Sequence, residues 1–171
     1  MKFNPKTRQF TSVEDMNESL IRMWNSVAQP GDIIYILGDV AFMQSTAATK
    51  IMQRLNGEKI LITGNHDSKL LKDKQFRDEF TAIYPYYELR LDDQKYCLFH
   101  FPIAEWNQCH RGAIHLHGHL HGNPSGLEEF KAIDVGYDAT GKIMISVAEV
   151  LAIADARKIK KHGDSKTDNM V

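Results

Sequence analysis

The sequence predicts a mixed α/β or α+β fold, and three patterns support this. Residues 33–37 and 59–63 are short apolar runs bounded by turn residues, which is typical of buried strands. Helix-like segments precede, separate and follow these two runs. Residues 86–145 consist mainly of short strand-like runs. We therefore expect mixed β-sheets with helices packed on their outer faces.

The individual elements follow from spacing and turn chemistry. Ser12 is expected to cap the first helix, which has an apolar stripe at helical spacing, and Ser146 is expected to cap the last. The predicted helices are 13–27, 47–55, 68–80 and 147–157, and the predicted strands are 33–37, 59–63, 86–91, 94–99, 113–117, 131–135 and 142–145. We expect one domain over residues 1–157 and a polar tail without fixed structure over 158–171.

Composition narrows the class of protein. The chain has 171 residues, which suits one domain, and 21 basic against 22 acidic residues, so it has no overall attraction to nucleic acid or anionic membranes. Two cysteines, Cys97 and Cys109, do not make a disulfide framework, which favours a reducing cytoplasm. Because no apolar stretch approaches the ~20 residues that a membrane span needs, we expect no membrane partner.

Four polar clusters each follow a strand-like run. Taken alone, a glycine-aspartate pair is a common turn, and a single histidine at a strand end is more often structural than a ligand. Two histidines at alternate positions are stronger, because alternate residues of an extended segment point the same way. The clusters are Gly38-Asp39, Gly64-Asn65-His66-Asp67, His100-Phe101-Pro102 and Gly118-His119-Leu120-His121.

Together the clusters predict a metal site. Carboxylate, amide and imidazole ligands suit divalent manganese, iron or zinc. Two such ions ~3.5–4 Å apart can hold the attacking and leaving oxygens of a phosphoryl displacement. His115 and His117 lie near the site by alternation, either as further ligands or as structural histidines, and Trp106 is either a pocket wall or a core residue.

These motifs, in this order, resemble those of the calcineurin-like metallophosphoesterases, in particular the small bacterial and phage members. The resemblance runs from about Phe10 to Glu149. It implies a four-layer sandwich of mixed sheets with outer helices and two metal ions at one edge. It also implies hydrolysis of phosphate mono- or diesters by a metal-activated hydroxide, with nucleic acid as a partner only if it is the substrate.

The resemblance also assigns roles to the residues. Asp39 would bridge the two metal ions. Asn65, His100 and His119 would complete one metal site, and His121 would belong to the other. His66 would contact the phosphate or protonate the leaving oxygen, with Asp67 orienting its ring.

The first motif of that family, Asp-x-His at the end of the first strand, has no match ahead of Asp39. The only earlier aspartates are Asp15, in a predicted helix, and Asp32, at the start of a strand. We therefore expect that a first strand and loop, on the order of 15–25 residues, are missing. The expected result is one tight metal site, a weak second site, and an open sheet edge that favours dimerisation or strand exchange.

The sequence is also compatible with two other functions. One is a catalytically impaired metal-binding or interaction protein on the same fold, which the missing motif favours. The other is a structural zinc protein, which is disfavoured because the ligands lack clustered cysteines.

Overall fold

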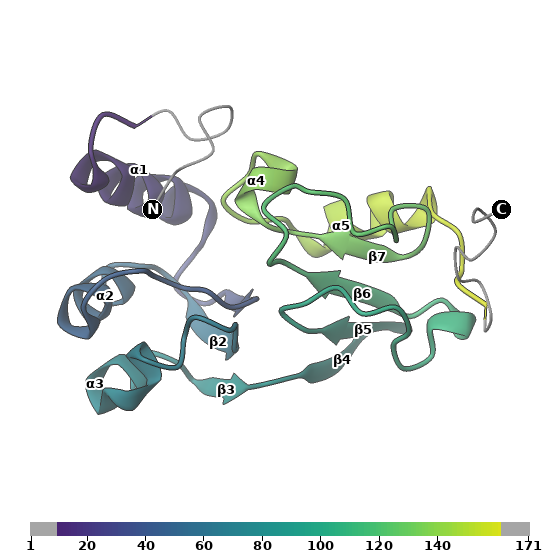
Figure 1. Ribbon diagram of the computed structural model, residues 1–171, viewed down its shortest axis with the longest axis horizontal. Helices are drawn as coiled ribbons and strands as arrows, with labels where there is room; N and C mark the ends of the chain where they lie inside the picture. The colour runs from purple at the N-terminus through teal and green to yellow at the C-terminus, as the bar shows by residue number, and fades with distance from the viewer. Residues whose placement is uncertain (1–9, 162–171) are drawn as a thin grey trace, which may run out of the picture.

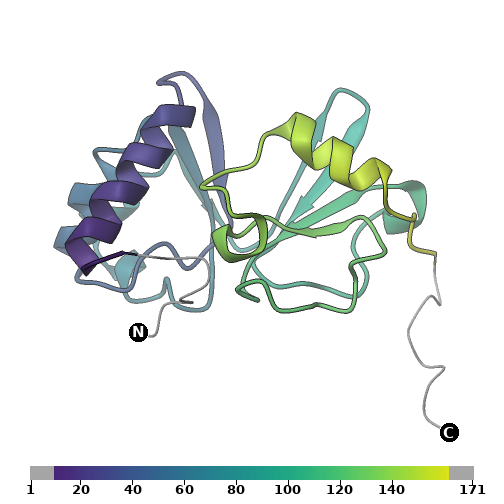
Figure 2. The same cartoon turned by 90° about the horizontal axis from the view of Figure 1, so that it is seen from above.

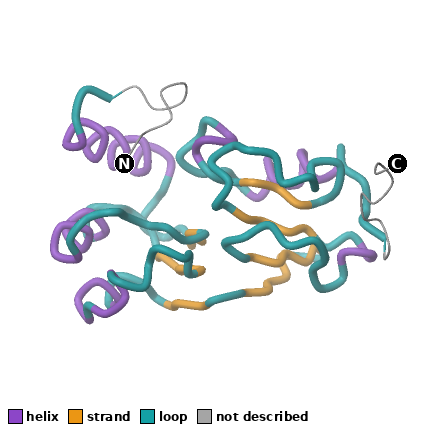
Figure 3. The backbone as a smooth tube through the Cα atoms, in the orientation of Figure 1, coloured by secondary structure: helices purple, strands orange, loops and turns teal. Residues whose placement is uncertain are grey.

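The computed structural model describes residues 10–161, which form two β-sheets and the helices around them (Figures 1 and 3). The first sheet is parallel throughout and has the order β1(Ile33–Ile36)-β2(Glu58–Ile62)-β3(Ala82–Tyr84). The second has the order β4(Tyr87–Leu91)-β5(Gln94–Leu98)-β6(Ile114–His117)-β7(Ala132–Asp134). In it β4 and β5 are antiparallel, whereas the other two pairs are parallel. The expected mixed α/β class is confirmed.

Helices lie beside both sheets. The main helices are α1(Val13–Val27), α2(Ser45–Met52) and α5(Val147–Asp155), and the short ones are α3(Lys74–Arg77), α4(Tyr137–Thr140), η1(Leu70–Lys72) and η2(Cys109–Arg111). Figure 2 shows α1 and α2 on the outer side of the first sheet and α5 beside the second. Both expected caps form: Ser12 Oγ accepts from the Asp15 N–H at 3.0 Å, and Ser146 forms a capping box with Glu149.

Alternation along the strands divides the interior into layers. Leu61 of β2 packs against Phe76 and the helices, whereas its neighbours Ile60 and Ile62 pack toward the second sheet against Leu98. A third cluster, built around Trp106, covers the other face of the second sheet. Strand β2 therefore has buried apolar neighbours on both faces, as its continuous apolar run predicts.

Two predicted elements are wrong, and one strand was missed. Residues 68–80 form two short helices instead of one, because Asp73 has extended backbone and its side chain caps the Gln75 N–H at 2.9 Å. Residues 142–145 pair with no described strand, although Ile145 packs on the core. Strand β3 was not predicted, because three residues are too short a pattern to recognise.

The ordered domain extends beyond residue 157. Lys158 pairs with Phe130 in a β-bridge, and Lys160 is buried with its ammonium group 4.5 Å from the Phe130 ring. The expectation of an unstructured tail is therefore wrong for residues 158–161, and its remainder, 162–171, lies outside the described residues. Among the described residues, no helix is long and apolar enough to cross a membrane.

Candidate metal centre

The predicted site residues lie in loops that follow the carboxyl ends of four strands. Asp39 follows β1, Asn65 and His66 follow β2, His100 follows β5, and His119 follows β6. Strands of both sheets therefore supply side chains to one place. One ligand atom each from Asp39, His100 and His119 lies within 4.8 Å of the other two, a spacing that can hold one metal ion.

His100 is buried, and its surroundings fix which ring nitrogen carries hydrogen. Its Nδ1 lies 2.7 Å from the Leu37 carbonyl oxygen, which can only accept, so Nδ1 donates. In the neutral ring, Nε2 then carries a lone pair. Histidine metal ligands are oriented in this way by a backbone carbonyl on the opposite nitrogen.

The free nitrogen of His100 faces two acceptors. Asn65 Oδ1 is 3.0 Å from His100 Nε2, and Asp39 Oδ2 is 3.4 Å from the same atom. The His119 ring lies edge-on to the His100 ring, with 5.1 Å between centroids. His100 is buried, Asp39 is half-buried, and Asn65 and His119 are exposed, so these donor atoms face one another at a place that is open to solvent on one side. This donor set suits a divalent metal ion such as manganese, iron or zinc.

Strained backbone marks the same residues. Among the described residues, five that are not glycine have positive φ, and three of these are Asp39 (55°), His119 (70°) and His121 (51°). A positive φ costs an L residue of this kind about 1–2 kcal/mol. Such strain persists only where the surrounding structure imposes it, and it concentrates at functional sites.

Two glycines allow the loops after β1 and β2 to touch. A Cβ at Gly38 would lie 2.4 Å from the Gly64 nitrogen and 2.7 Å from His100 Nδ1. A Cβ at Gly64 would lie 2.3 Å from Asp39 Oδ1. Both positions therefore require glycine, which explains why each loop begins with one.

We expect Gly38→Ala to lower the free energy of unfolding by more than the positive φ at this position alone would explain. Gly126 is the matched control, because its φ is +80° against +82° at Gly38 and a Cβ added there would meet nothing within 4 Å. Gly126→Ala should lower the free energy of unfolding by about 1–2 kcal/mol, and Gly38→Ala by roughly 2 kcal/mol more, because of the clash with backbone. Urea unfolding of both variants measures the difference, and equal losses would contradict the close approach.

Asp67 does not orient His66, which corrects the role expected for it. Its carboxylate is fully buried and accepts three backbone N–H groups: from Asp39 at 3.0 Å, from Val40 at 2.9 Å and from Gly64 at 2.7 Å. It therefore holds the loop after β1 against the loop after β2. Ionised carboxylates make strong hydrogen bonds of this kind.

His66 lies at the exposed mouth of the site. Its backbone N–H donates to Asp39 Oδ1 at 2.9 Å, and its ring lies 5.1 Å from the Phe42 ring, centroid to centroid. It does not belong to the three-residue metal group. The residue is exposed, so its side chain is accessible from solvent.

His121 lies apart from the three-residue group and has a carboxylate partner that the sequence did not reveal. Its Nδ1 is 3.0 Å from Oδ2 of Asp138, whose side chain is only 4% exposed. Asp138 belongs to the four-residue helix α4, which follows no recognisable motif. A carboxylate on one nitrogen orients an imidazole so that the other nitrogen can bind a metal ion.

His115, one of the additional histidines of β6, is structural. His115 is fully buried, with Nδ1 3.1 Å from the Cys97 carbonyl and Nε2 accepting from the Ile103 N–H at 3.3 Å. Trp106 is also buried, and its indole N–H donates to the Ala113 carbonyl at 2.8 Å, so it is a core residue. The Phe101 carbonyl oxygen also lies 3.2 Å from Nε2, so both ring nitrogens of His115 have backbone partners.

The burial of His115 predicts an acid-sensitive fold. Burial lowers its pKa from 6.5 to about 4, so the unfolded chain binds this proton more readily. The contribution of His115 to the free energy of unfolding is complete above pH 6.5, where the ring is neutral in both the folded and the unfolded state. This contribution is lost as the pH falls toward 4. Between pH 7.5 and pH 5 we expect a loss of ~2 kcal/mol in the free energy of unfolding from this group. Urea unfolding at pH 7.5 and at pH 5 measures this loss. His115→Gln should remove the part of the pH dependence that comes from His115. The exposed control His110→Gln should retain it.

Comparison with known proteins places the chain in a family. No family model matches it. It is 30% identical over 161 residues to an uncharacterized protein of Methanocaldococcus jannaschii, and the match covers 89% of this chain and 82% of that protein. The chain belongs to the family of this archaeal protein. A second relative of the chain is the gene 66 protein of Mycobacterium phage L5, with 26% identity over 162 residues, 77% of this chain and 78% of the phage protein.

A solved structure has a similar fold. A protein of unknown function from Aquifex aeolicus superposes with a TM-score of 0.58 at 22% identity, over 79% of this chain and 81% of that one. At this identity the similarity concerns the fold alone. It supports the arrangement of two sheets and helices on which the candidate metal centre is built.

Proposed function

We propose that the chain is a metal-dependent phosphoesterase with the four-layer sandwich of the calcineurin-like metallophosphoesterases. The observation that supports this most strongly is the convergence of Asp39, His100 and His119, with His100 Nε2 set as a lone-pair donor by the Leu37 carbonyl. Asn65 Oδ1, 3.0 Å from the same nitrogen, adds a fourth ligand. A bound divalent ion would supply Lewis acidity and an activated hydroxide.

The side chains around the ion have different roles in the proposed hydrolysis. Asp39, Asn65, His100 and His119 would hold the ion, and the carboxylate of Asp39 would offset part of its positive charge. His66 is exposed, and its ring would donate a hydrogen bond to a phosphate oxygen or a proton to the leaving oxygen. The backbone N–H of His66 donates to Asp39 Oδ1, which ties the main chain at His66 to a proposed metal ligand.

A second, weaker metal site is part of the proposal. Asp39, as the bridge, and His121, supported by Asp138, are its ligands among the described residues. Two protein ligands are too few for tight binding. We therefore expect one tightly bound ion per chain and a second that binds weakly. Metal analysis after dialysis measures this: two tightly held ions in a monomer would contradict it.

Hydrolysis of bis(4-nitrophenyl) phosphate and 4-nitrophenyl phosphate tests the activity and separates diesters from monoesters. We expect turnover with added Mn²⁺ and none in protein stripped with a chelator. Stoichiometric Mn²⁺ binding without turnover of either ester would contradict the proposed phosphoesterase activity. It would support the alternative, which is a metal-binding or interaction protein on this fold. An open, mostly apolar cavity beside the site is the observation that favours this alternative.

A reducing compartment such as the cytoplasm is the proposed location. Cys97 and Cys109 are both free and buried. Free thiols of this kind are typical of proteins that fold where disulfides do not form.

A further inference from the structure

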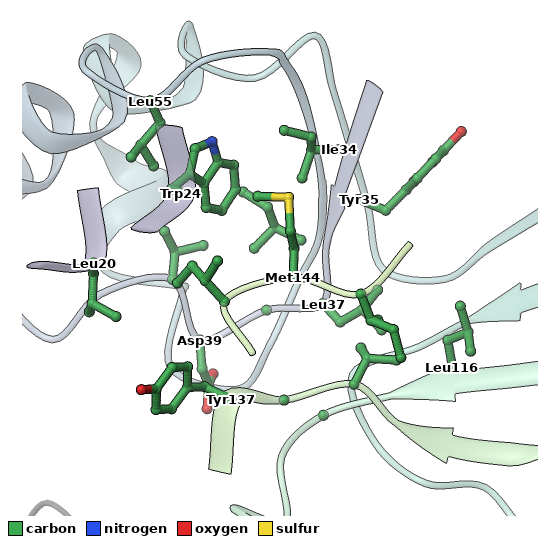
Figure 4. A pocket seen from close by; sticks show the side chains of 18 of the residues that line it. Leu20, Trp24, Ile34, Tyr35, Leu37, Asp39, Leu55, Leu116, Tyr137 and Met144 are labelled. Carbon is green, nitrogen blue, oxygen red and sulfur yellow. The ribbon is translucent and has the colours of Figure 1, made fainter. Parts of the chain in front are cut away.

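His117 is a buried histidine at the end of β6, directly before the loop that carries His119. Its neighbour Leu116 lines the apolar cavity beside the candidate metal centre, as Figure 4 shows. Because successive side chains of a strand point to opposite faces, His117 faces away from this cavity. It is only 1% exposed and does not belong to the three-residue metal group. A role other than direct metal binding is therefore needed to explain a histidine at this position.

Two aromatic residues on the same face hold the His117 ring in place. The centroid of the His117 ring lies 5.3 Å from that of His115, which in turn lies 5.5 Å from that of Trp106. Backbone hydrogen bonds fix both of these neighbours: the Trp106 indole N–H donates to a carbonyl, and both ring nitrogens of His115 have backbone partners. The His117 ring thus packs against anchored rings, which restricts its rotation.

The His117 ring contacts the backbone of the next residue. Its Nδ1 atom lies 3.1 Å from the Gly118 carbonyl oxygen, which can only accept, so Nδ1 donates. The same oxygen accepts the Leu120 N–H at 2.9 Å, and the Gly118 N–H donates to the His100 carbonyl at 3.0 Å. The peptide group ahead of Gly118 is therefore tied to a proposed metal ligand, His100. The peptide group after Gly118 is tied to the His117 ring.

His119 depends on this second peptide group. Its φ of 70° is a rotation about the bond that follows the Gly118–His119 peptide, and a positive φ is unfavourable for a histidine. Strained backbone of this kind persists only where the surrounding structure imposes it. Gly118 has no side chain to restrict its own backbone, so contacts from other residues must set the peptide orientation. The His117 ring supplies one of these contacts.

We propose that His117 is a positioning residue of the metal centre. By donating to the Gly118 carbonyl, it holds the His119 imidazole at the distance from Asp39 and His100 that a divalent ion requires. It acts through the backbone and does not touch the ion. Because this role is defined by metal binding, it rests on the proposed metal centre.

His115 is the matched control for His117. Both are buried histidines of β6 that lie on the same face, two residues apart. The His115 ring contacts the backbone of Cys97, Phe101 and Ile103, however, and none of these residues is a proposed ligand. Removing either imidazole should destabilise the fold, but only removal of His117 should disturb the metal centre of the folded protein.

Calorimetric titration of the full chain with Mn²⁺ tests this role without any measurement of activity. His117→Leu removes the donor and should lower the Mn²⁺ affinity roughly 10–100-fold, as is typical when a group that orients a metal ligand is lost. His117→Asn places an amide N–H near the position of Nδ1 and should recover most of the affinity. His115→Leu should leave the affinity of the folded protein unchanged. Circular dichroism confirms that each variant is folded at the temperature of the titration.

A double-mutant cycle shows whether His117 acts through His119. In a His119→Ala chain, His117→Leu should have no further effect on the Mn²⁺ affinity, because the imidazole that it positions is already absent. If His117→Leu does not fold, His117→Gln takes its place in both experiments, since its amide group reaches toward the position of Nε2 and not that of Nδ1. Additive losses of affinity in the cycle would contradict the proposal.

The outcomes separate this role from the metal centre itself. Equal Mn²⁺ affinities of His117→Leu and the unaltered chain would overturn the positioning role and leave the metal centre in place. Equal losses in His117→Leu and His115→Leu would show that the affinity follows the packing of this face, which would also overturn it. Absence of Mn²⁺ binding by the unaltered chain would overturn the metal centre and the role of His117 together.

Discussion

Replacing Asp39 by asparagine should reduce hydrolysis of bis(4-nitrophenyl) phosphate about 1000-fold in kcat/KM. The carboxylate is the only anionic ligand of the three-residue group, and its loss removes the charge that holds a divalent ion. A metal ion supplies several kcal/mol of transition-state stabilisation, and each ~1.4 kcal/mol corresponds to a factor of ten in rate. The affinity for Mn²⁺, measured by calorimetry, should fall with the activity.

The fold should survive this change. An amide oxygen in place of Asp39 Oδ1 can still accept the His66 N–H, which is 2.9 Å away. Asp93→Asn is the matched control, because Asp93 is exposed in the turn between β4 and β5. It makes the same chemical change away from the site. Equal activity of Asp39→Asn and Asp93→Asn would rule Asp39 out as a metal ligand.

Replacing Asp67 by alanine should lower the free energy of unfolding by about 4 kcal/mol, because three buried N–H groups lose a charged acceptor. This is a large part of the roughly 5–15 kcal/mol typical of a domain. Urea unfolding should be measured with a chelator present, so that any loss of metal binding does not contribute to the difference.

Two further variants make this prediction specific. Asp78→Ala removes an exposed carboxylate whose ion pair with Lys74 is solvated, and it should cost under about 0.5 kcal/mol. Asp67→Asn retains one acceptor oxygen but turns an amino group toward an N–H, so it should cost roughly 2 kcal/mol. This second change remains measurable if Asp67→Ala fails to fold. Equal stability of Asp67→Ala and Asp78→Ala would show that the carboxylate does not hold the loops together.

Most of the secondary structure could be predicted because its signals are local. The cap of α1 at Ser12 and the capping box at Ser146 depend on residues three positions apart, and both occur as expected. The apolar run of β2 is recognisable because residues on both faces of this strand are buried, whereas the run of β1 is recognisable from its composition although its residues are only partly buried or exposed. The break at Asp73 was missed, because the side chain competes with the helix for a backbone N–H.

The candidate site was predictable in part for the same reason. Glycines and polar residues directly after strands identified Asp39, His100 and His119, which the structure brings within one metal-binding distance. The role of Asp67 was wrong, because its partners Asp39 and Val40 are 28 and 27 positions away in sequence. Asp138 was missed because its contact with His121 depends on the path of α4.

The sequence by itself determined the strands and capped helices and the order of the polar clusters, because these depend on neighbours a few residues apart. Only the tertiary structure decided which nitrogen of His100 faces the ligands, since the Leu37 carbonyl comes from another sheet. It also decided that His115 is structural and that the edge of β1 borders an apolar cavity. Burial and hydrogen-bond partners across sheets are properties of packing, which spacing along a chain does not specify.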